Sequence, residues 1–436
     1  ASVTTSLLLT CFAISILSNK LTPAPLRLPM IKETLAIKDF KIMHCNAGWR
    51  DFSFLRIHTD EGISGISEYN ECYGSPGLSV IIDKFMYKII DENPINHERI
   101  HQFLYASSRQ APGGIAQQAI AAIENALLDI KGKKLNVPVH TLLGGAVRNK
   151  LELYWSHCGT YRISEELSKI MQKPQVKSLN DLKQLGKDVK DAGYKGLKTN
   201  IFTFNGSPKL EMQGFAGDSG WPELNVDSHI IDSLIKQIDA LRSGAGEKMG
   251  IHLDLNFNFK TEGYLKITRA LDDLNLTWFE IDTYHPESLR RIRDANKTPI
   301  ASCESLFGIR EFRPFFENAS MDVAIIDIPW NGIWLGMKIA AMAEAYETNV
   351  APHNFYGNLS TLMSAHFCAA VPNFRVMEID PDDIPWKDDI ITWKPEIVDG
   401  DLIVPKQPGW GAELNEEIFK MHPPKFIKQV GQKISK

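Results

Sequence analysis

Residues 250–304 contain three short apolar runs, GIHLDL (250–255), TWFEI (277–281) and PIASCE (299–304). Each run is followed by a stretch whose apolar residues have helical spacing, and no antiparallel hairpin signal separates the runs. Short apolar strands that alternate with helices are typical of parallel sheets, because consecutive parallel strands need a crossover connection. The stretch therefore predicts consecutive strand-helix units.

The same rhythm continues on both sides of these three runs. Two similar runs precede them and three follow, namely LELYWSH (151–157), YKGLKT (194–199), VAIID (323–327), NVAPH (349–353) and FRVME (374–378). An open parallel sheet with this many strands is less common than a closed barrel, and no GxGxxG motif follows the first run. We predict a parallel α/β barrel over residues 151–380.

The first part of the chain has a different pattern. Three runs between residues 31 and 69 alternate β-branched and aromatic residues with polar ones, which predicts short antiparallel strands: IKDFKIMH, FSFLRIHT and ISGISEY. Residues 113–134 carry apolar residues three and four apart, which predicts a buried helix closed by glycine. Residues 30–150 are thus expected to form an α+β domain, which the turn-rich tail at about 381–420 would complete.

The composition limits the possible partners. The chain has 436 residues, 44% of them hydrophobic, which suits two domains with a sizeable core. Its 48 basic and 53 acidic residues leave a net charge of −5, so no basic surface for nucleic acid or an anionic membrane is expected, and a small molecule is the better partner. The six cysteines form no CxxC pair, which indicates reduced thiols and a cytoplasmic protein.

The N-terminus carries an apolar run of signal-peptide length, SLLLTCFAISIL (6–17). No Lys or Arg precedes Lys20, so the basic region of a signal peptide is missing, and the run is too short to span a bilayer comfortably. We interpret residues 1–29 as an extension outside a fold that begins near Met30. A signal peptide is the alternative.

One connection in the predicted barrel is anomalous. Residues 200–226 are longer than an ordinary strand-to-helix loop and rich in Gly, Ser and Pro. At that position the segment is expected to lie over the mouth of the barrel as a lid or specificity loop.

Ionisable residues stand at the ends of seven predicted strands, where a parallel barrel directs side chains into its mouth. They are Lys198, Asp254, Glu280, Glu304, Asp327, His353 and Glu378. Gathered together, these groups would repel one another and lose hydration without a compensating cation.

Three consecutive strands supply the carboxylates Asp254, Glu280 and Glu304, which are 26 and 24 residues apart. A single acidic residue at such a place is readily explained as the cap of the next helix, but three at similar spacing indicate a metal site. Carboxylate oxygens with open positions suit Mg²⁺, and the absence of Cys and His from the set argues against Zn²⁺.

The next two strands end in Asp327 and His353. The carboxylate can accept a hydrogen bond from one imidazole nitrogen and leave the other nitrogen facing the cavity. Such a pair makes a tuned acid or base, so a catalytic role is favoured over a structural one.

From about residue 30 to residue 416 the chain resembles the mandelate racemase and acid-sugar dehydratase branch of the enolase superfamily. The order and spacing of several segments carry the resemblance, including TDEGISGISE, GYKGLKTN, HLDLN, WFEI, PIASCES, DVAIID and VAPHNFYG. It implies a (β/α)7β barrel beneath an α+β capping domain, and a symmetric homo-oligomer.

The resemblance also assigns roles at the site. It implies that Asp254, Glu280 and Glu304 bind Mg²⁺, and that Lys198 lies against the substrate carboxylate. Asp327 and His353 would form the catalytic dyad, and Glu378 would hydrogen-bond the substrate. The metal would stabilise the enediolate that forms when the α-proton leaves.

Two departures from the family pattern bear on the reaction. Racemases of the family carry Lys-x-Lys on the second strand, whereas this chain has Lys198-Thr199-Asn200, and an amide cannot serve as the second base of a racemase. Lys-x-Asn resembles the galactonate dehydratases, but the histidine that they carry two residues after the first metal ligand is replaced by Asn256. The identity of the general acid is therefore left open.

Several further residues are candidates for substrate contacts. Asn200 and Asn256 stand at strand ends, and His157, Tyr161 and Arg162 follow the first strand; packing and capping are the alternative for those three. In the capping domain, Trp49, Arg50 and Tyr73 lie in plausible loops over the mouth, and an arginine there suits a hydroxylated or dicarboxylate substrate.

The sequence therefore predicts a lyase that dehydrates an acid sugar to a 2-keto-3-deoxy acid. His353 would transfer the proton, oriented by Asp327. An epimerase, racemase or cycloisomerase on the same site is the first alternative, because it shares the enolate step. A barrel that only binds a ligand is the second, although a retained base would add nothing to binding.

Overall fold

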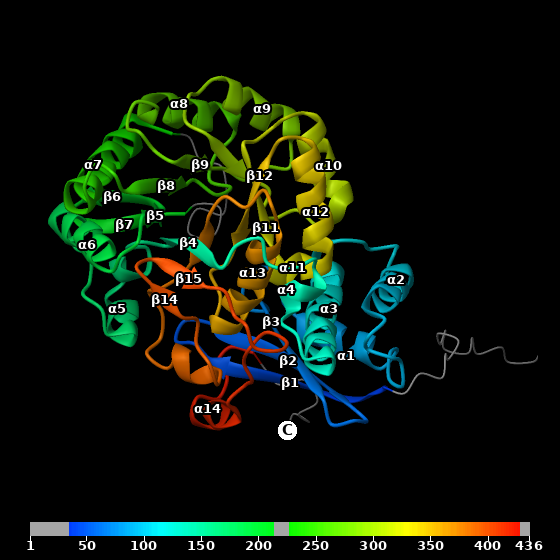
Figure 1. Ribbon diagram of the computed structural model, residues 1–436. Helices are drawn as coiled ribbons and strands as arrows, with labels where there is room; N and C mark the ends of the chain where they lie inside the picture. Colours follow the sequence, from blue (N-terminus) through cyan, green and yellow to red (C-terminus); the bar gives the residue numbers. More distant parts are fainter. Residues whose placement is uncertain (1–34, 213–225, 428–436) are drawn as a thin grey trace, which may run out of the picture.

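The computed structural model describes residues 35–212 and 226–427. In this part the chain forms a capping domain, with a small antiparallel sheet and helices, packed against a barrel of parallel strands (Figure 1). No helix in the described ranges is both long and apolar enough to cross a membrane. The predicted fold class is confirmed, whereas the residue bounds predicted for the domains stay predictions.

The capping sheet is an antiparallel meander of three strands, as expected: β1 (Ile37–Asn46), β2 (Asp51–Thr59) and β3 (Ser64–Tyr69). Four helices follow: α1 (Leu78–Met86), α2 (His97–Ser107), α3 (Gly114–Leu135) and α4 (Val139–Leu142). Helix α3 ends at Leu135 and is capped by Asn136, which has a left-handed φ of 55°, and not by the predicted glycine. Gly132 lies inside the helix. A larger residue would not fit there, because a Cβ would lie 2.9 Å from the Cα of Gly409.

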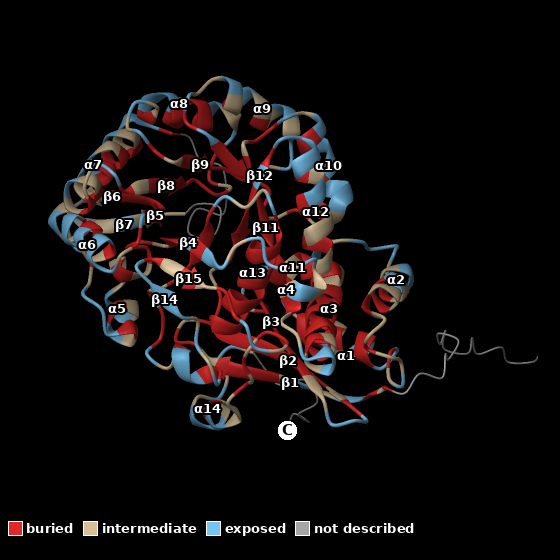
Figure 2. Ribbon diagram, in the orientation of Figure 1, coloured by how far each residue is buried: buried red, intermediate tan, exposed pale blue. Residues whose placement is uncertain are grey.

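Eight parallel strands form the barrel, and each overlaps one of the predicted apolar runs. They are β4 (Lys150–Trp155), β5 (Gly196–Thr199), β8 (Gly250–Asp254), β9 (Trp278–Glu280), β10 (Ile300–Ser302), β11 (Val323–Asp327), β12 (Asn349–His353) and β13 (Met377–Ile379). β13 pairs with β4, and a bridge from Val350 to Phe374 joins β12 to the segment before β13, so the barrel closes. Figure 2 shows its strands as buried elements.

The connections between the strands are mainly helical. Residues 156–172 hold a short 3-10 helix, Tyr161–Ile163, and α5 (Glu165–Met171). The longer helices that surround the barrel are α6 (Leu179–Asp191), α7 (Ser228–Ala245), α8 (Thr261–Leu271), α9 (Pro286–Asp294), α10 (Gly308–Glu317) and α12 (Ile333–Ala345). A single turn, α11 (Ile328–Asn331), follows β11. Apolar periodicity explains this arrangement, since each helix turns its buried side chains toward the strands.

Helix α13 (Asn358–Ala370) is buried along its whole length, because it lies between the barrel and the capping domain. Glu68, on β3, accepts hydrogen bonds from the backbone N–H groups of Gly357 at 2.6 Å and Ser360 at 2.9 Å. A capping-domain carboxylate therefore binds the N-terminus of a barrel helix, which fixes the capping domain over the barrel.

The expected lid segment begins as regular structure. Residues 201–211 form a hairpin of β6 (Ile201–Asn205) and β7 (Ser207–Glu211), where an irregular loop was predicted. The alternation in IFTFN and the Gly206 turn explain the hairpin, since Gly206 adopts a φ of 89°. The remainder of the predicted lid, residues 213–225, lies outside the described residues, as do residues 1–34.

The C-terminal tail touches both domains. It forms a 3-10 helix (Lys387–Ile390), β14 (Ile397–Val398), β15 (Asp401–Ile403) and α14 (Glu416–Met421). β15 pairs antiparallel with β4 of the barrel, whereas the indole of Trp410 donates to the carbonyl of Ile66 in the capping sheet. Asp383, in the first half of the tail, also pairs with Arg50 of the capping domain. The tail therefore packs on the N-terminal domain, as expected, and on the barrel as well.

Candidate active site

The structure brings the seven strand-end groups together. All are buried: Lys198, Asp254, Glu280, Glu304, Asp327, His353 and Glu378. Asp254 lies opposite Glu280 in the strand register, and Asp327 lies opposite His353. The carboxyl ends of parallel strands therefore gather the side chains at one end of the barrel, as such ends do in general.

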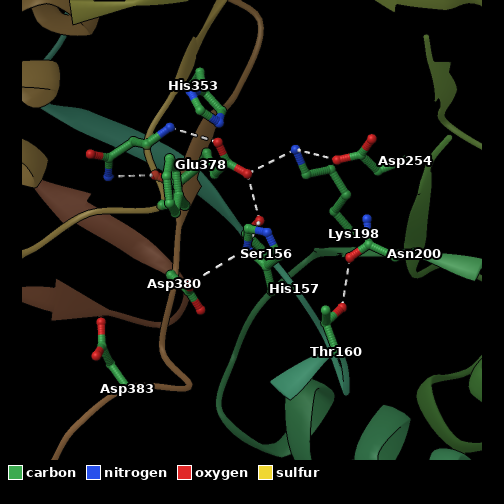
Figure 3. Close-up of polar contacts among 12 residues, drawn as sticks. Ser156, His157, Thr160, Lys198, Asn200, Asp254, His353, Glu378, Asp380 and Asp383 are labelled. Atoms are coloured by element: carbon green, nitrogen blue, oxygen red, sulfur yellow. Dashed lines mark hydrogen bonds and ion pairs between the residues drawn. The ribbon is translucent and has the colours of Figure 1, made fainter. Parts of the chain in front are cut away.

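Lys198 lies among three of the carboxylates. Its Nζ is 2.9 Å from Glu378 Oε1, 3.0 Å from Glu280 Oε1 and 3.3 Å from Asp254 Oδ2. Figure 3 shows the ammonium directed at Glu378 and Asp254. Burial alone would raise the pKa of Glu378, but Lys198 and the two histidines nearby hold that pKa well below its usual range. Glu378 is therefore an anion.

The other carboxylates of the cluster are only partly compensated by positive charge, because they share Lys198 and His353. Burial, with the help of neighbouring carboxylates, raises the pKa of Glu280 to about 8 despite the contact with Lys198. It also raises the pKa of Glu304 and of Asp282, whose Oδ2 has no hydrogen-bond partner. A cluster of buried carboxylate oxygens that is short of cations fits a hard divalent ion such as Mg²⁺. In residues 35–212 and 226–427, no three acidic, His or Cys side chains are already arranged as a metal site.

His353 and Asp327 form a buried pair. His353 Nδ1 lies 2.6 Å from Asp327 Oδ2, and Nε2 lies 3.5 Å from Glu304 Oε2. Asp327 also accepts from the backbone N–H of Trp330 at 2.7 Å and from the Tyr356 hydroxyl at 2.5 Å. Burial alone would lower the pKa of His353, but Glu304 and Asp327 raise it to about 10. The geometry orients the imidazole, with Nε2 on the side of the acidic cluster.

A cavity of about 710 Å³ opens beside these groups. Its walls include Lys198, Asp254, Glu304 and His353 from the strand ends. Apolar and aromatic side chains complete it, including Leu167, Leu210, Met212, Phe257, Trp330 and Phe355. A larger surface hollow of about 1010 Å³ follows the C-terminal tail but contains none of the seven strand-end groups, so we place the candidate site in the smaller cavity.

Four of the predicted substrate contacts line this cavity: Tyr73, His157, Tyr161 and Asn256. Asn200 does not line it; its side chain accepts from Thr160 at 2.7 Å and lies 3.3 Å from Asn256, which it can position. Trp49 packs on Tyr161, with 4.8 Å between ring centroids.

The two predicted arginines are held elsewhere. Arg50 is buried and pairs with Asp383 at 2.8 Å, and it donates to the carbonyl of Phe355 at 2.6 Å. Arg162 pairs with Asp382 at 2.5 Å. The structure therefore places neither guanidinium in the cavity lining, because buried carboxylates of the tail bind both.

Several residues at or near the site were not predicted from the sequence. Phe355 and Tyr356 directly follow the His353 strand in HNFYG, and Trp330 follows Asp327 by three residues, so position next to a strand end was a usable signal. Asp282 follows Glu280 by two residues, which gives it the same face of an extended segment. Asp380 follows Glu378 in the same way and is the last residue of the predicted barrel range.

Comparisons with known proteins agree with this architecture. Residues 30–144 match the N-terminal domain of the mandelate racemase / muconate lactonizing enzyme family, and residues 181–418 match the enolase C-terminal domain-like family. D-xylonate dehydratase of Haloferax volcanii is 26% identical, over 84% of each chain. Arabinonate dehydratase of Saccharolobus solfataricus is 28% identical, over 84% of this chain and 88% of its own.

A solved structure is more similar in sequence. It is a Burkholderia xenovorans protein, provisionally named an L-alanine-DL-glutamate epimerase, bound to magnesium and fumarate. It is 46% identical with a TM-score of 0.88, and the match covers 90% of this chain and 98% of that one. With both domains matched and enzymes of known class among the relatives, the chain belongs to the mandelate racemase/muconate lactonizing enzyme family of the enolase superfamily.

Proposed function

We propose that this enzyme is a magnesium-dependent lyase that dehydrates an acid sugar to a 2-keto-3-deoxy acid. The observation that carries the proposal is the buried His353–Asp327 pair, which faces the carboxylate cluster and Lys198 across one cavity. An oriented imidazole beside a cationic side chain suits removal of the proton next to a carboxylate. The curated dehydratases among the relatives support the same reaction.

Asp254, Glu280 and Glu304 would hold the Mg²⁺ ion. The raised pKa values of Glu280 and Glu304, and the shortage of positive charge around the three carboxylates, make the donor set suitable for it. When bound, the ion would stabilise the negative charge that develops on the substrate carboxylate as the α-proton leaves.

Residues of the chain itself transfer the proton, orient the base and bind the substrate carboxylate. Asp327 holds His353 Nδ1 and so fixes the tautomer and the ring orientation. With Mg²⁺ at Glu304, the carboxylate that does most to raise the His353 pKa would be neutralised, and the neutral imidazole would take the α-proton at Nε2. Lys198 places its ammonium against the substrate carboxylate. Glu378 accepts from Ser156 and from the backbone N–H of Asn354, which holds its carboxylate toward Lys198. Wall residues such as Phe355 and Trp330 exclude water from the reacting centre.

The Tyr356→Phe variant is expected to lower kcat about tenfold with little change in KM. It removes a hydrogen bond to Asp327, and a bond to a charged group contributes roughly 1.5–3 kcal/mol, part of which orients His353. Steady-state kinetics over a range of pH would measure the effect. Tyr87→Phe, at an exposed tyrosine, is the control. An unchanged kcat at every pH would exclude a role for this hydroxyl.

An epimerase on the same site is the second candidate, because the 46%-identical Burkholderia xenovorans protein is provisionally named an epimerase. Both reactions begin with removal of an α-proton. They differ in the next step, since an epimerase returns a proton to the opposite face of the same carbon and a dehydratase expels the β-hydroxyl.

Incubation with a panel of sugar acids in D₂O, with Mg²⁺ or with EDTA, tests the proposal. We expect a 2-keto acid from at least one substrate, detected by mass spectrometry, and none with EDTA. Deuterium incorporation accompanied by an inverted stereocentre would instead identify an epimerase. If no acid either exchanges or reacts, the enzyme does not use this chemistry on sugar acids.

A further inference from the structure

A second histidine-carboxylate pair lies at the edge of the same cavity, which its histidine, His157, lines. Asp380 directly follows β13, and His157 lies just beyond the end of β4, which pairs with β13 through Trp155 and Ile379. His157 Nδ1 lies 3.4 Å from Asp380 Oδ2 (Figure 3). The Asp380 side chain is fully buried, and neither of its carboxylate oxygens has a hydrogen-bond partner in the described structure. A buried carboxylate without donors needs a positive partner, and the imidazole is placed to be one.

The imidazole of His157 is held in a fixed orientation. The ring stacks on Tyr161 with 5.0 Å between centroids and an interplanar angle of 20°, and Ser156 Oγ lies 3.2 Å from Nδ1. The residue has a φ of 47°, a left-handed conformation that is uncommon for residues other than glycine and that His adopts more readily than most. The next residue, Cys158, donates its N–H to the carbonyl of Lys198, which ties this turn to the neighbouring strand. Strained backbone of this kind tends to occur at functional sites.

His157 and His353 approach the cavity from different strands. Both line it, and both rings lie near Phe355, at 6.1 Å and 5.0 Å between centroids. In the described structure, the polar contacts of His157 involve Nδ1, which leaves Nε2 for a ligand. Lys198 is engaged with three carboxylates and is less free to supply a proton.

We propose that His157, positioned by Asp380, is the acid that protonates the departing β-hydroxyl group. This inference rests on the proposed dehydration and supplies the general acid that the sequence leaves open. His353 accepts the α-proton, and the electron pair of that C–H bond passes through the enediolate into a double bond between the α- and β-carbons. The bond from the β-carbon to oxygen breaks, and the oxygen takes the Nε2 proton of His157 and leaves as water. The enol that remains then moves its hydroxyl proton to the β-carbon and becomes the 2-keto acid.

The test separates the two proton transfers in the full-length enzyme with Mg²⁺ in D₂O. For the His157→Gln variant, 2-keto acid formation is expected to fall by about 10²-fold or more, the usual range for loss of a general acid. Deuterium at the α-carbon of recovered substrate should stay within several-fold of wild type or rise, because His353 still forms the enediolate. Asp380→Asn should also raise the ratio of α-carbon exchange to 2-keto acid formation, but by a smaller factor than His157→Gln. The double variant should lose little more than His157→Gln, because the two residues act as one unit.

The controls make the outcome decisive. His58→Asn, at a partly exposed histidine of the capping sheet, should change neither rate. Thermal melting and Mg²⁺ binding of each variant establish that the fold is retained. The proposal is overturned if 2-keto acid formation by His157→Gln stays within about threefold of wild type, or if exchange and product formation fall together. If the wild type dehydrates none of the acids, the proposed function fails first, and that result is visible before any variant is made.

Discussion

The His353→Asn variant is expected to lose turnover by about 10³-fold or more while keeping its fold. Acid-base groups contribute roughly 10²–10⁴-fold to rates, and here one imidazole starts the reaction by taking the α-proton. The amide of Asn cannot accept a proton at neutral pH, and it is too short to bring a nitrogen to the place of Nε2. Both α-proton exchange and product formation should therefore disappear together.

This joint loss distinguishes His353 from His157, whose replacement should spare exchange. Deuterium incorporation and 2-keto acid formation would be followed in the same samples, with His58→Asn as the control. The fold is expected to persist because the His353 side chain lines the cavity and is not part of the apolar core. An exchange rate close to that of wild type in His353→Asn would remove this residue, and its pairing with Asp327, from the proposed mechanism.

The parts of the site that follow from the sequence are those set by strand periodicity. A parallel barrel brings the ends of all its strands to one rim, so the last polar residue of each apolar run could be placed without knowing any contact. Asp254, Glu280 and His353 were found in this way, and all lie beside the cavity or its acidic cluster. The hairpin at residues 201–211 could not be inferred as readily, because tertiary context decides whether so short an alternating segment pairs.

The predictions that the structure does not support concern residues whose contacts join distant segments of the chain. Arg50 and Arg162 were expected to meet a substrate, but their partners Asp383 and Asp382 lie 333 and 220 residues further along the chain. A single sequence contains no signal for such pairings. Asp380 has a local signal, its place two residues after Glu378, but its contact with His157 arises only when β13 pairs with β4. Substrate contacts are therefore less predictable than strand-end ligands in this fold.

Removal of divalent metal is expected to abolish both α-proton exchange and dehydration, and Mg²⁺ binding is expected to release a proton. Without the ion, the raised pKa of Glu280, about 8, keeps this carboxyl largely protonated at pH 7. An Mg²⁺ ion needs the ionised form, so the proton must leave on binding. The apparent affinity should then rise by about tenfold per pH unit below pH 8 and level off above it, since one pKa unit corresponds to a factor of ten.

Calorimetric titration of Mg²⁺ in two buffers of different ionisation enthalpy would measure the proton release directly. Glu280→Gln should reduce the proton release and bind the ion much more weakly, whereas Glu396→Gln, at an exposed glutamate of the tail, should behave as wild type. Bound Mg²⁺ should also raise the melting temperature, because it relieves repulsion among buried carboxylates and binds only the folded chain. An affinity independent of pH between about 6 and 8 would mean that Glu280 is already ionised, and its pairing with Lys198 would then be the stronger influence.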